Sequence, residues 1–246
     1  MRNSYAGAPV MEGLGRHYEI DVACRGEVHP IHSYLVDIKA IDRGVRELLV
    51  PEIEDACREF PGKSPASVLW SRARELNARL GRLVTRVRWY LTPTFSVEID
   101  MSKPGKAILR QRFDFAASHR LNVASLSPEE NARLFGKCNN PNGHGHNYLV
   151  EPSVEVDVEP HGRHALTLRQ LEEIVDDVVL RRFDHKNLNL DTPEFADGRG
   201  LNPSVENIAK VVYELLAPEI SRRCEGAFLR DVTVWESERT SSTYPG

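Results

Sequence analysis

Residues 137–148 read Lys-Cys-Asn-Asn-Pro-Asn-Gly-His-Gly-His-Asn-Tyr. The residues after Gly143 predict a β-strand, because apolar side chains recur at even positions: Tyr148, Val150, Val154, Val156 and Val158. Side chains two residues apart on a strand point to the same face. His144 and His146 can therefore reach one metal ion, although a His-x-His pair alone is a weak sign of a metal site.

A third histidine occurs in a similar context. His119 ends an alternating stretch that contains Phe113, Phe115 and Ala117, just before a polar loop. Three histidines and an open fourth position are typical of a catalytic zinc site rather than a structural one. His119, His144 and His146 are therefore the predicted zinc ligands.

The bulk composition excludes several classes of protein. With 246 residues, 41% of them hydrophobic and 28% charged, the chain can form one large or two small packed domains. The net charge of −4 argues against a general nucleic-acid binder, which usually carries a basic face. No apolar run approaches the roughly 18 residues of a membrane span, and the N-terminus lacks the apolar core of a signal peptide. The four cysteines form no Cys-x-x-Cys pair, which favours free thiols and a cytoplasmic location.

The second half of the sequence predicts an α+β unit. The turn-rich stretch 101–106 separates two expected domains, 1–104 and 105–246. After two strands, helical spacing of apolar residues predicts one helix that begins near Thr167 and another that begins after Ser204. A strand over residues 229–235 comes near the end of the unit.

The first half is interpreted as a divergent copy of the same unit, with an unrelated domain as the alternative. When the two halves are aligned with an offset of 130 residues, only six residues are identical. The interpretation therefore rests on the order of helices and strands. The expected strand, helix, helix start and strand lie at residues 18–28, 36–49, 64–67 and 83–91. This copy lacks a counterpart of the first strand and its histidine.

The substitutions in the first copy predict that it is inactive. Leu14 and Arg16 stand where the second half has His144 and His146. Leucine cannot coordinate zinc, and a permanently charged arginine would repel it. We therefore expect one zinc ion per chain.

Five segments resemble the 6-pyruvoyl-tetrahydropterin synthase family. They are FDFAASHRL (113–121), KCNNPNGHGHNY (137–148), RFDHKNLN (182–189), NPSVENIA (202–209) and VWESERTSS (234–242). The resemblance runs from about Ala107 to Tyr244. It implies the tunnelling fold, here as two tandem units, each with an antiparallel sheet and two helices on one face. It also implies a zinc-dependent lyase that eliminates triphosphate from 7,8-dihydroneopterin triphosphate.

The resemblance also assigns roles to single residues. Cys138 matches the family's catalytic cysteine, and Asp184 with His185 matches a proton-handling pair that reaches the active site from a neighbouring subunit. Glu236 matches the carboxylate that anchors the pterin, and Glu206 is carried as a second pterin contact. Ordinary structural interpretations stay open: a charged cluster at a helix end for Asp184 and His185, and a carboxylate favoured by the helix dipole for Glu206.

Three other functions compete with the synthase. A 6-carboxy-tetrahydropterin synthase, on the route to queuosine, would release acetaldehyde from the same substrate. The five residues between Cys138 and His144 favour the pyruvoyl branch, and Cys138 itself counts against a folate-related branch that carries glutamate there. The third is a non-catalytic pterin-binding protein.

The resemblance implies assembly into barrels of six units. A chain with two units would fill such a particle with three copies, so we expect a homotrimer that forms a pseudo-hexamer. Its partners would be a small pterin triphosphate and further copies of the chain, with neither nucleic acid nor a membrane involved.

Overall fold

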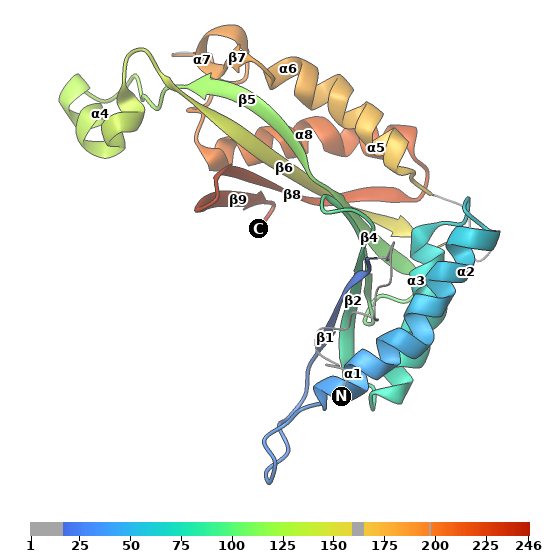
Figure 1. Cartoon of the computed structure of the whole chain (residues 1–246). Helices are drawn as coiled ribbons and strands as arrows, with labels where there is room; N and C mark the ends of the chain where they lie inside the picture. The colour runs from blue at the N-terminus through green and yellow to red at the C-terminus, as the bar shows by residue number, and fades with distance from the viewer. Residues whose placement is uncertain (1–16, 159–164, 197) are drawn as a thin grey trace. The chain divides into compact units, whose positions relative to one another are not determined.

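The computed structural model describes residues 17–158, 165–196 and 198–246 (Figure 1). The chain divides into two compact units. The first takes the described residues up to Leu109 together with those of Val156–Ala165, and the second takes Arg110–Glu155 with the described residues from Leu166 to Gly246. Leu14 and Arg16, on which the prediction of an inactive first copy rests, lie outside the described residues.

The second unit is built on antiparallel strand pairs. Strand β5 (Phe113–His119) pairs with β6 (His144–Asp157), and β8 (Ala227–Ser237) pairs with β6 and with β9 (Thr240–Tyr244). The short strand β7 (Lys186–Asn187) adds to β5 in parallel. Pairing between β5 and β6 ends at Val150, two residues before Pro152, so the proline removes no hydrogen bond from that ladder.

Two long helical segments cover one face of these strands (Figure 1). One comprises α5 (Leu168–Val175), the π-helix η3 (Asp176–Leu180) and α6 (Arg181–Phe183), and the other is α8 (Val205–Arg223). Both predicted helix starts are confirmed, because Thr167 and Ser204 are the N-caps of α5 and α8. Apolar side chains fill the space between helices and strands, including Phe115, Tyr148, Leu171, Ile174, Val212, Leu216, Val232 and Val234, each 2% exposed or less.

Several shorter elements of the second unit were not predicted. Helix α4 (Pro128–Phe135) and the 3-10 turn η2 (Gly136–Asn139) precede the His-x-His strand, and α7 (Leu188–Asp191) follows β7. Helix α4 begins with a capping box, in which Ser127 and Glu130 bind each other's backbone N–H groups. That signal was present in the sequence.

The first unit has strands in the order β1 (Glu19–Cys24), β2 (Val84–Tyr90), β3 (Phe95–Asp100) and β4 (Lys106–Gln111). Its helices are α1 (Ile38–Gly44), the π-helix η1 (Val45–Leu49), α2 (Val50–Glu59) and α3 (Pro65–Arg79). Strand β1 is shorter than the predicted 18–28, the predicted helix continues to Glu59, and β3 was not predicted. Leu69, Ala73 and Leu76 on α3 and Val87, Val97 and Ile99 on the strands are completely buried and form the core.

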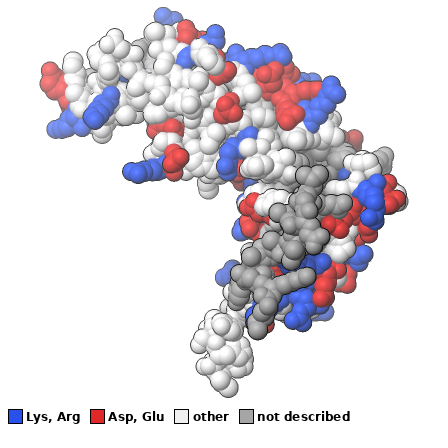
Figure 2. All heavy atoms as spheres, viewed as in Figure 1, with Lys and Arg blue, Asp and Glu red and all other residues white. Residues whose placement is uncertain are grey.

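On the face seen in Figure 2, basic side chains (Lys and Arg) and acidic side chains (Asp and Glu) are interspersed, and neither charge dominates. Within the described ranges, no helix combines the length and the apolar character that a membrane span requires.

Candidate metal centre

The pairing of β5 with β6 brings the three predicted zinc ligands together. In this register His119 lies directly opposite His144, and His146 lies opposite Ala117. Directly opposed residues of an antiparallel pair project from the same face, so the three imidazoles share one face of the sheet. The strand predicted after Gly143 is confirmed, and it is this strand that aligns His144 with His146.

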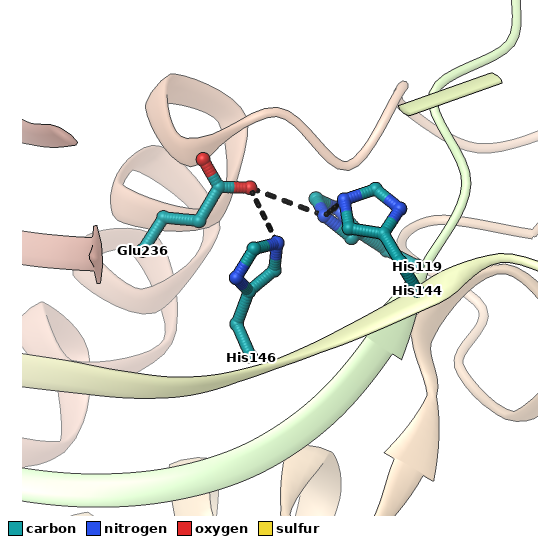
Figure 3. Close-up of side chains that lie close together, drawn as sticks. All are labelled: His119, His144, His146 and Glu236. Carbon is teal, nitrogen blue, oxygen red and sulfur yellow. Dashed lines mark hydrogen bonds and ion pairs between the residues drawn. The ribbon is translucent and has the colours of Figure 1, made fainter. Parts of the chain in front are cut away.

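The imidazoles form a compact cluster with a carboxylate from a third strand (Figure 3). His119 Nε2 lies 3.1 Å from His144 Nε2 and 3.1 Å from Glu236 Oε1. His146 Nε2 lies 3.3 Å from the same carboxylate oxygen. One potential ligand atom from each of the four residues lies within 4.8 Å of all the others. This group could hold one metal ion.

The orientation of His119 is fixed by a hydrogen bond outside the cluster. Its Nδ1 lies 2.7 Å from the carbonyl oxygen of Pro203, just before α8, and the ring is completely buried. A carbonyl oxygen can only accept, so Nδ1 carries the proton and the lone pair of Nε2 faces the cluster. Ligating histidines commonly have such a second partner.

The donor set fits zinc. Zinc in proteins takes imidazole nitrogen and carboxylate oxygen in four-coordinate sites. His146 Nε2 is buried and makes no hydrogen bond, although it lies close to Glu236. A buried nitrogen without a hydrogen bond is costly, and coordination to a cation in the cluster would satisfy it.

The protonation states also suit a cation. Burial lowers the pKa of His144, and the neighbouring imidazoles of His119 and His146 lower it further. Burial likewise lowers the pKa of His146, against the opposing effect of Glu236. Contact with the His119 ring lowers the pKa of Glu236 despite its partial burial, and the imidazoles of His146 and His144 act in the same direction. Neutral imidazoles beside an ionised carboxylate are the forms that bind metal.

Tyr148 lies beside two of the histidines, and the sequence analysis used it only as a strand marker. Its ring packs edge to face against His119 and His146, at centroid distances of 5.9 and 5.6 Å, and stacks on Phe115 at 5.0 Å. The side chain is completely buried. Burial raises the pKa of Tyr148, and the nearby acidic groups of Glu236 and Cys138 raise it further, so the phenol stays neutral. Its even position in the alternating strand was the signal for this location.

Cys138 lies on η2, before the loop that leads into β6. Its thiol is free and its side chain is half-buried. The carbonyl oxygen of Cys138 accepts a hydrogen bond of 2.9 Å from the N–H of Leu121, two residues after His119. Cys138 is therefore tied to the segment that leaves the metal centre, although it does not belong to the group of potential ligands.

Asp184 and His185 form a pair at the outer edge of β5. His185 Nδ1 lies 2.9 Å from Asp184 Oδ2, and Asp184 Oδ1 accepts a hydrogen bond of 2.9 Å from the N–H of Ala116. That backbone bond lowers the pKa of Asp184. The His185 side chain is 83% exposed. An open depression of about 490 Å³ beside the pair is lined by Ala116, Ala117, Ser118, Gly145, His146, Asn147, His185, Lys186 and Asn187.

Glu206 is not brought into the cluster. It lies in the first turn of α8 and is exposed. A carboxylate at this position is favoured by the helix dipole. Among the described residues, the potential metal group contains His119, His144, His146 and Glu236, without Glu206 or His185.

Comparison with known proteins identifies the second unit. A family model described as 6-pyruvoyl tetrahydropterin synthase matches residues 108–246, more than half of the chain. The chain belongs to this family. All eight site residues that the sequence of this chain predicts lie inside the segment that matches the family.

Named relatives agree with the family match. The human 6-pyruvoyl tetrahydrobiopterin synthase is 37% identical over 141 residues, which are 57% of this chain and 92% of the human protein. The Drosophila melanogaster 6-pyruvoyl tetrahydrobiopterin synthase is 35% identical over 147 residues, 59% of this chain and 83% of that protein. The solved structure of the Caenorhabditis elegans 6-pyruvoyl tetrahydropterin synthase superposes with a TM-score of 0.50 at 32% identity, over 57% of this chain and 96% of that one.

Membership of the 6-pyruvoyl tetrahydropterin synthase family settles two of the predictions. The chain is an enzyme of the lyase class. Its α+β class and its tunnelling fold, expected from the sequence, are confirmed.

Proposed function

We propose that the chain is a zinc-dependent 6-pyruvoyl-tetrahydropterin synthase, which converts 7,8-dihydroneopterin triphosphate to 6-pyruvoyl-tetrahydropterin with elimination of triphosphate. One observation carries the proposal: His119, His144, His146 and Glu236 form a cluster with potential ligand atoms within 4.8 Å of one another. That cluster lies inside the segment that matches the family.

The three histidines would hold the zinc ion through neutral imidazoles. When bound, zinc would supply Lewis acidity toward the side-chain hydroxyls of the substrate and stabilise negative charge that develops there. The hydrogen bond from His119 Nδ1 to Pro203 supports this assignment because it leaves Nε2 free to coordinate. Glu236 is near enough to serve as a fourth ligand until substrate arrives.

Cys138 would take the proton from the substrate carbon. A thiol is a base only as thiolate, and an adjacent cation favours that form. The backbone hydrogen bond between Leu121 and Cys138 supports the role, because it ties the residue to the end of the strand that carries His119.

Asp184 and His185 would form the second proton-transfer group of the reaction, besides Cys138. Asp184 holds the imidazole through His185 Nδ1, in the way that carboxylates orient catalytic histidines. With its side chain 83% exposed at the edge of β5, His185 has room to meet a neighbouring subunit. This exposure fits the expectation that the pair completes the active site of an adjacent copy.

Glu236 would anchor the pterin. An ionised carboxylate can accept two hydrogen bonds from a guanidine-like edge, and the lowered pKa of Glu236 keeps it ionised. In this role it would exchange its contacts with the histidines for contacts with the substrate. Glu206 is proposed as a second pterin contact that belongs to the assembled enzyme.

Residues 105–246 would be the catalytic unit and residues 1–104 a degenerate tandem copy. The order of helices and strands supports duplication, and so do two π-helices. These helices are η1 in the first unit and η3 in the second, and each interrupts the first long helical segment of its unit. Because π-helices are rare, the same interruption at the same place supports a common origin.

The assembly would be a homotrimer that forms a pseudo-hexamer, with catalytic units in one ring and degenerate units in another. That arrangement gives each catalytic unit a catalytic neighbour to supply Asp184 and His185. The four free cysteines support a reducing compartment such as the cytoplasm.

Product analysis tests the proposed function. The zinc-loaded chain is incubated with 7,8-dihydroneopterin triphosphate, and the pterin mass, free triphosphate and acetaldehyde are measured. We expect the mass of 6-pyruvoyl-tetrahydropterin and one triphosphate per turnover. Acetaldehyde in equal amount would instead assign the 6-carboxy branch, and binding without any product would identify a non-catalytic pterin-binding protein.

Cys138→Ala provides the matched control for this assay. A positioned acid–base group contributes roughly 10²–10⁴-fold to turnover. The variant should bind zinc as wild type does and lose turnover by about that factor. Wild-type turnover in Cys138→Ala would remove the thiol from the mechanism.

A further inference from the structure

The segment that follows His119 is held in place by hydrogen bonds from side chains rather than by strand pairing. The Arg120 N–H donates to Asn189 Oδ1 at 2.7 Å, and Asn189 Nδ2 donates to the Arg120 carbonyl at 3.1 Å. The N–H of Asn122 donates to the Asn202 side chain at 3.0 Å. Asn202 directly precedes Pro203, whose carbonyl orients His119. Residues 120–122 are therefore fixed relative to the metal ligands.

The turn that carries Cys138 docks on this same segment. Besides the bond from Leu121 N–H to the Cys138 carbonyl, the Asn139 side chain donates to the Leu121 carbonyl at 2.7 Å and lies 3.0 Å from Asn122 Oδ1. The carbonyl of Asn139 accepts a bond of 3.1 Å from Arg120 Nε. Asn139 thus bonds all three residues that follow His119, through its side chain or its backbone.

We propose that Asn139 is a positioning residue for the reaction, which holds the Cys138 thiol at a fixed place beside the metal centre. The inference rests on the proposed function, in which Cys138 transfers a proton. The η2 turn has only four residues and lies next to an exposed loop, so its own hydrogen bonds provide little rigidity. The amide of Asn139 supplies the missing constraint because it acts as a backbone partner would.

Replacement of Asn139 by alanine is the sharpest test. The substitution removes the amide that donates to the Leu121 carbonyl at 2.7 Å and places no new charge beside the Cys138 thiol. Asn142→Ala is the matched control. Asn142 lies in the same loop and is exposed, and its backbone N–H rather than its side chain bonds Asn140.

Two measurements are made on each variant. The first is the rate of Cys138 alkylation by iodoacetamide in the metal-free chain, read by peptide mass, with the exposed Cys57 as internal reference. The second is steady-state turnover of the zinc-loaded chain. In Asn139→Ala we expect faster alkylation of Cys138 by about tenfold, the change that one net hydrogen bond supports. We expect kcat to fall by about 10- to 100-fold with KM little changed, as for residues that orient catalytic groups.

Protection of Cys224 and retention of zinc separate loss of positioning from general damage. Unfolding would raise alkylation at the buried Cys224 as well and would release zinc, whereas loss of positioning leaves Cys224 protected and one zinc bound. The proposal is overturned if Asn139→Ala matches Asn142→Ala in either alkylation or kcat. If Cys138→Ala has wild-type turnover, the proposed role of Cys138 in the reaction fails instead, and the alkylation comparison still reports whether Asn139 holds the turn.

Discussion

At the scale of single residues, Gly143 controls how closely the loop approaches His119. It adopts a left-handed backbone conformation with φ of +70°, and a Cβ atom there would lie 3.0 Å from the His119 carbonyl oxygen. Only glycine occupies this conformation without strain. A side chain at Gly143 would therefore displace either the loop or the backbone of a metal ligand.

Gly143→Ala should lower the free energy of unfolding by about 1–2 kcal/mol, the cost of a left-handed residue with a Cβ atom, and should weaken zinc binding. Gly145→Ala is the matched control, because a Cβ there would make an ordinary contact of 3.7 Å with the Ala117 carbonyl. Urea unfolding and zinc titration of the two variants provide the measurement. Equal behaviour of the two variants would show that the approach of Gly143 to His119 is unimportant.

The lowered pKa values of His144 and His146 predict a pH dependence of stability. Both groups have a folded pKa below the unfolded value of about 6.5. As pH falls below about 6.5, the unfolded chain takes up protons first, so the free energy of unfolding falls until the folded pKa values are passed.

Urea midpoints of the metal-free chain between about pH 5 and 7.5 test this dependence. The wild-type midpoint should fall with decreasing pH more steeply than that of a variant with both His144→Asn and His146→Asn. Parallel curves for the two proteins would contradict the shifted pKa values.

At the scale of elements, helix α5 depends on its first residues. The Thr167 hydroxyl accepts a bond from the Gln170 N–H at 3.2 Å, and Gln170 Oε1 accepts from the Thr167 N–H at 2.9 Å. Loss of such a cap costs about 1 kcal/mol. Thr167→Ala should lower the free energy of unfolding by about that amount, measured by urea titration.

Ser221→Ala is the control for this substitution, because Ser221 is exposed inside α8 and has no capping role. Its effect should stay within about 0.5 kcal/mol. A loss in Thr167→Ala no larger than this would mean that the capping box does not stabilise the helix.

Local sequence patterns were enough to predict several strands and helices. Alternation located β5 and β6, and N-cap residues located α5 and α8. The contact between Glu236 and the histidines could not be predicted from these patterns, because it depends on the pairing of β8 with β6, two strands that residues 158–226 separate in the sequence. The roles of Pro203 and Asn139 were missed for the same reason: each acts through a residue that is distant in the sequence.

At the scale of the whole molecule, the prediction concerns assembly. The proposed assembly would close strand edges that stay unpaired in a single chain. Light scattering during size exclusion should give three times the mass of one chain. A mass of one chain with full activity would exclude both the trimer and active sites shared between subunits.

The central claim is one catalytic metal site per chain, formed by His119, His144 and His146 in the second unit. Its most direct test is zinc titration of the metal-free chain, with bound zinc and turnover measured at each step. We expect turnover to rise linearly and to level at one zinc per chain, and the variant with His144→Ala and His146→Ala to bind no zinc at this site and to stay inactive. Full turnover without metal, a second equivalent needed for activity, or retention of zinc by the double variant would contradict the claim.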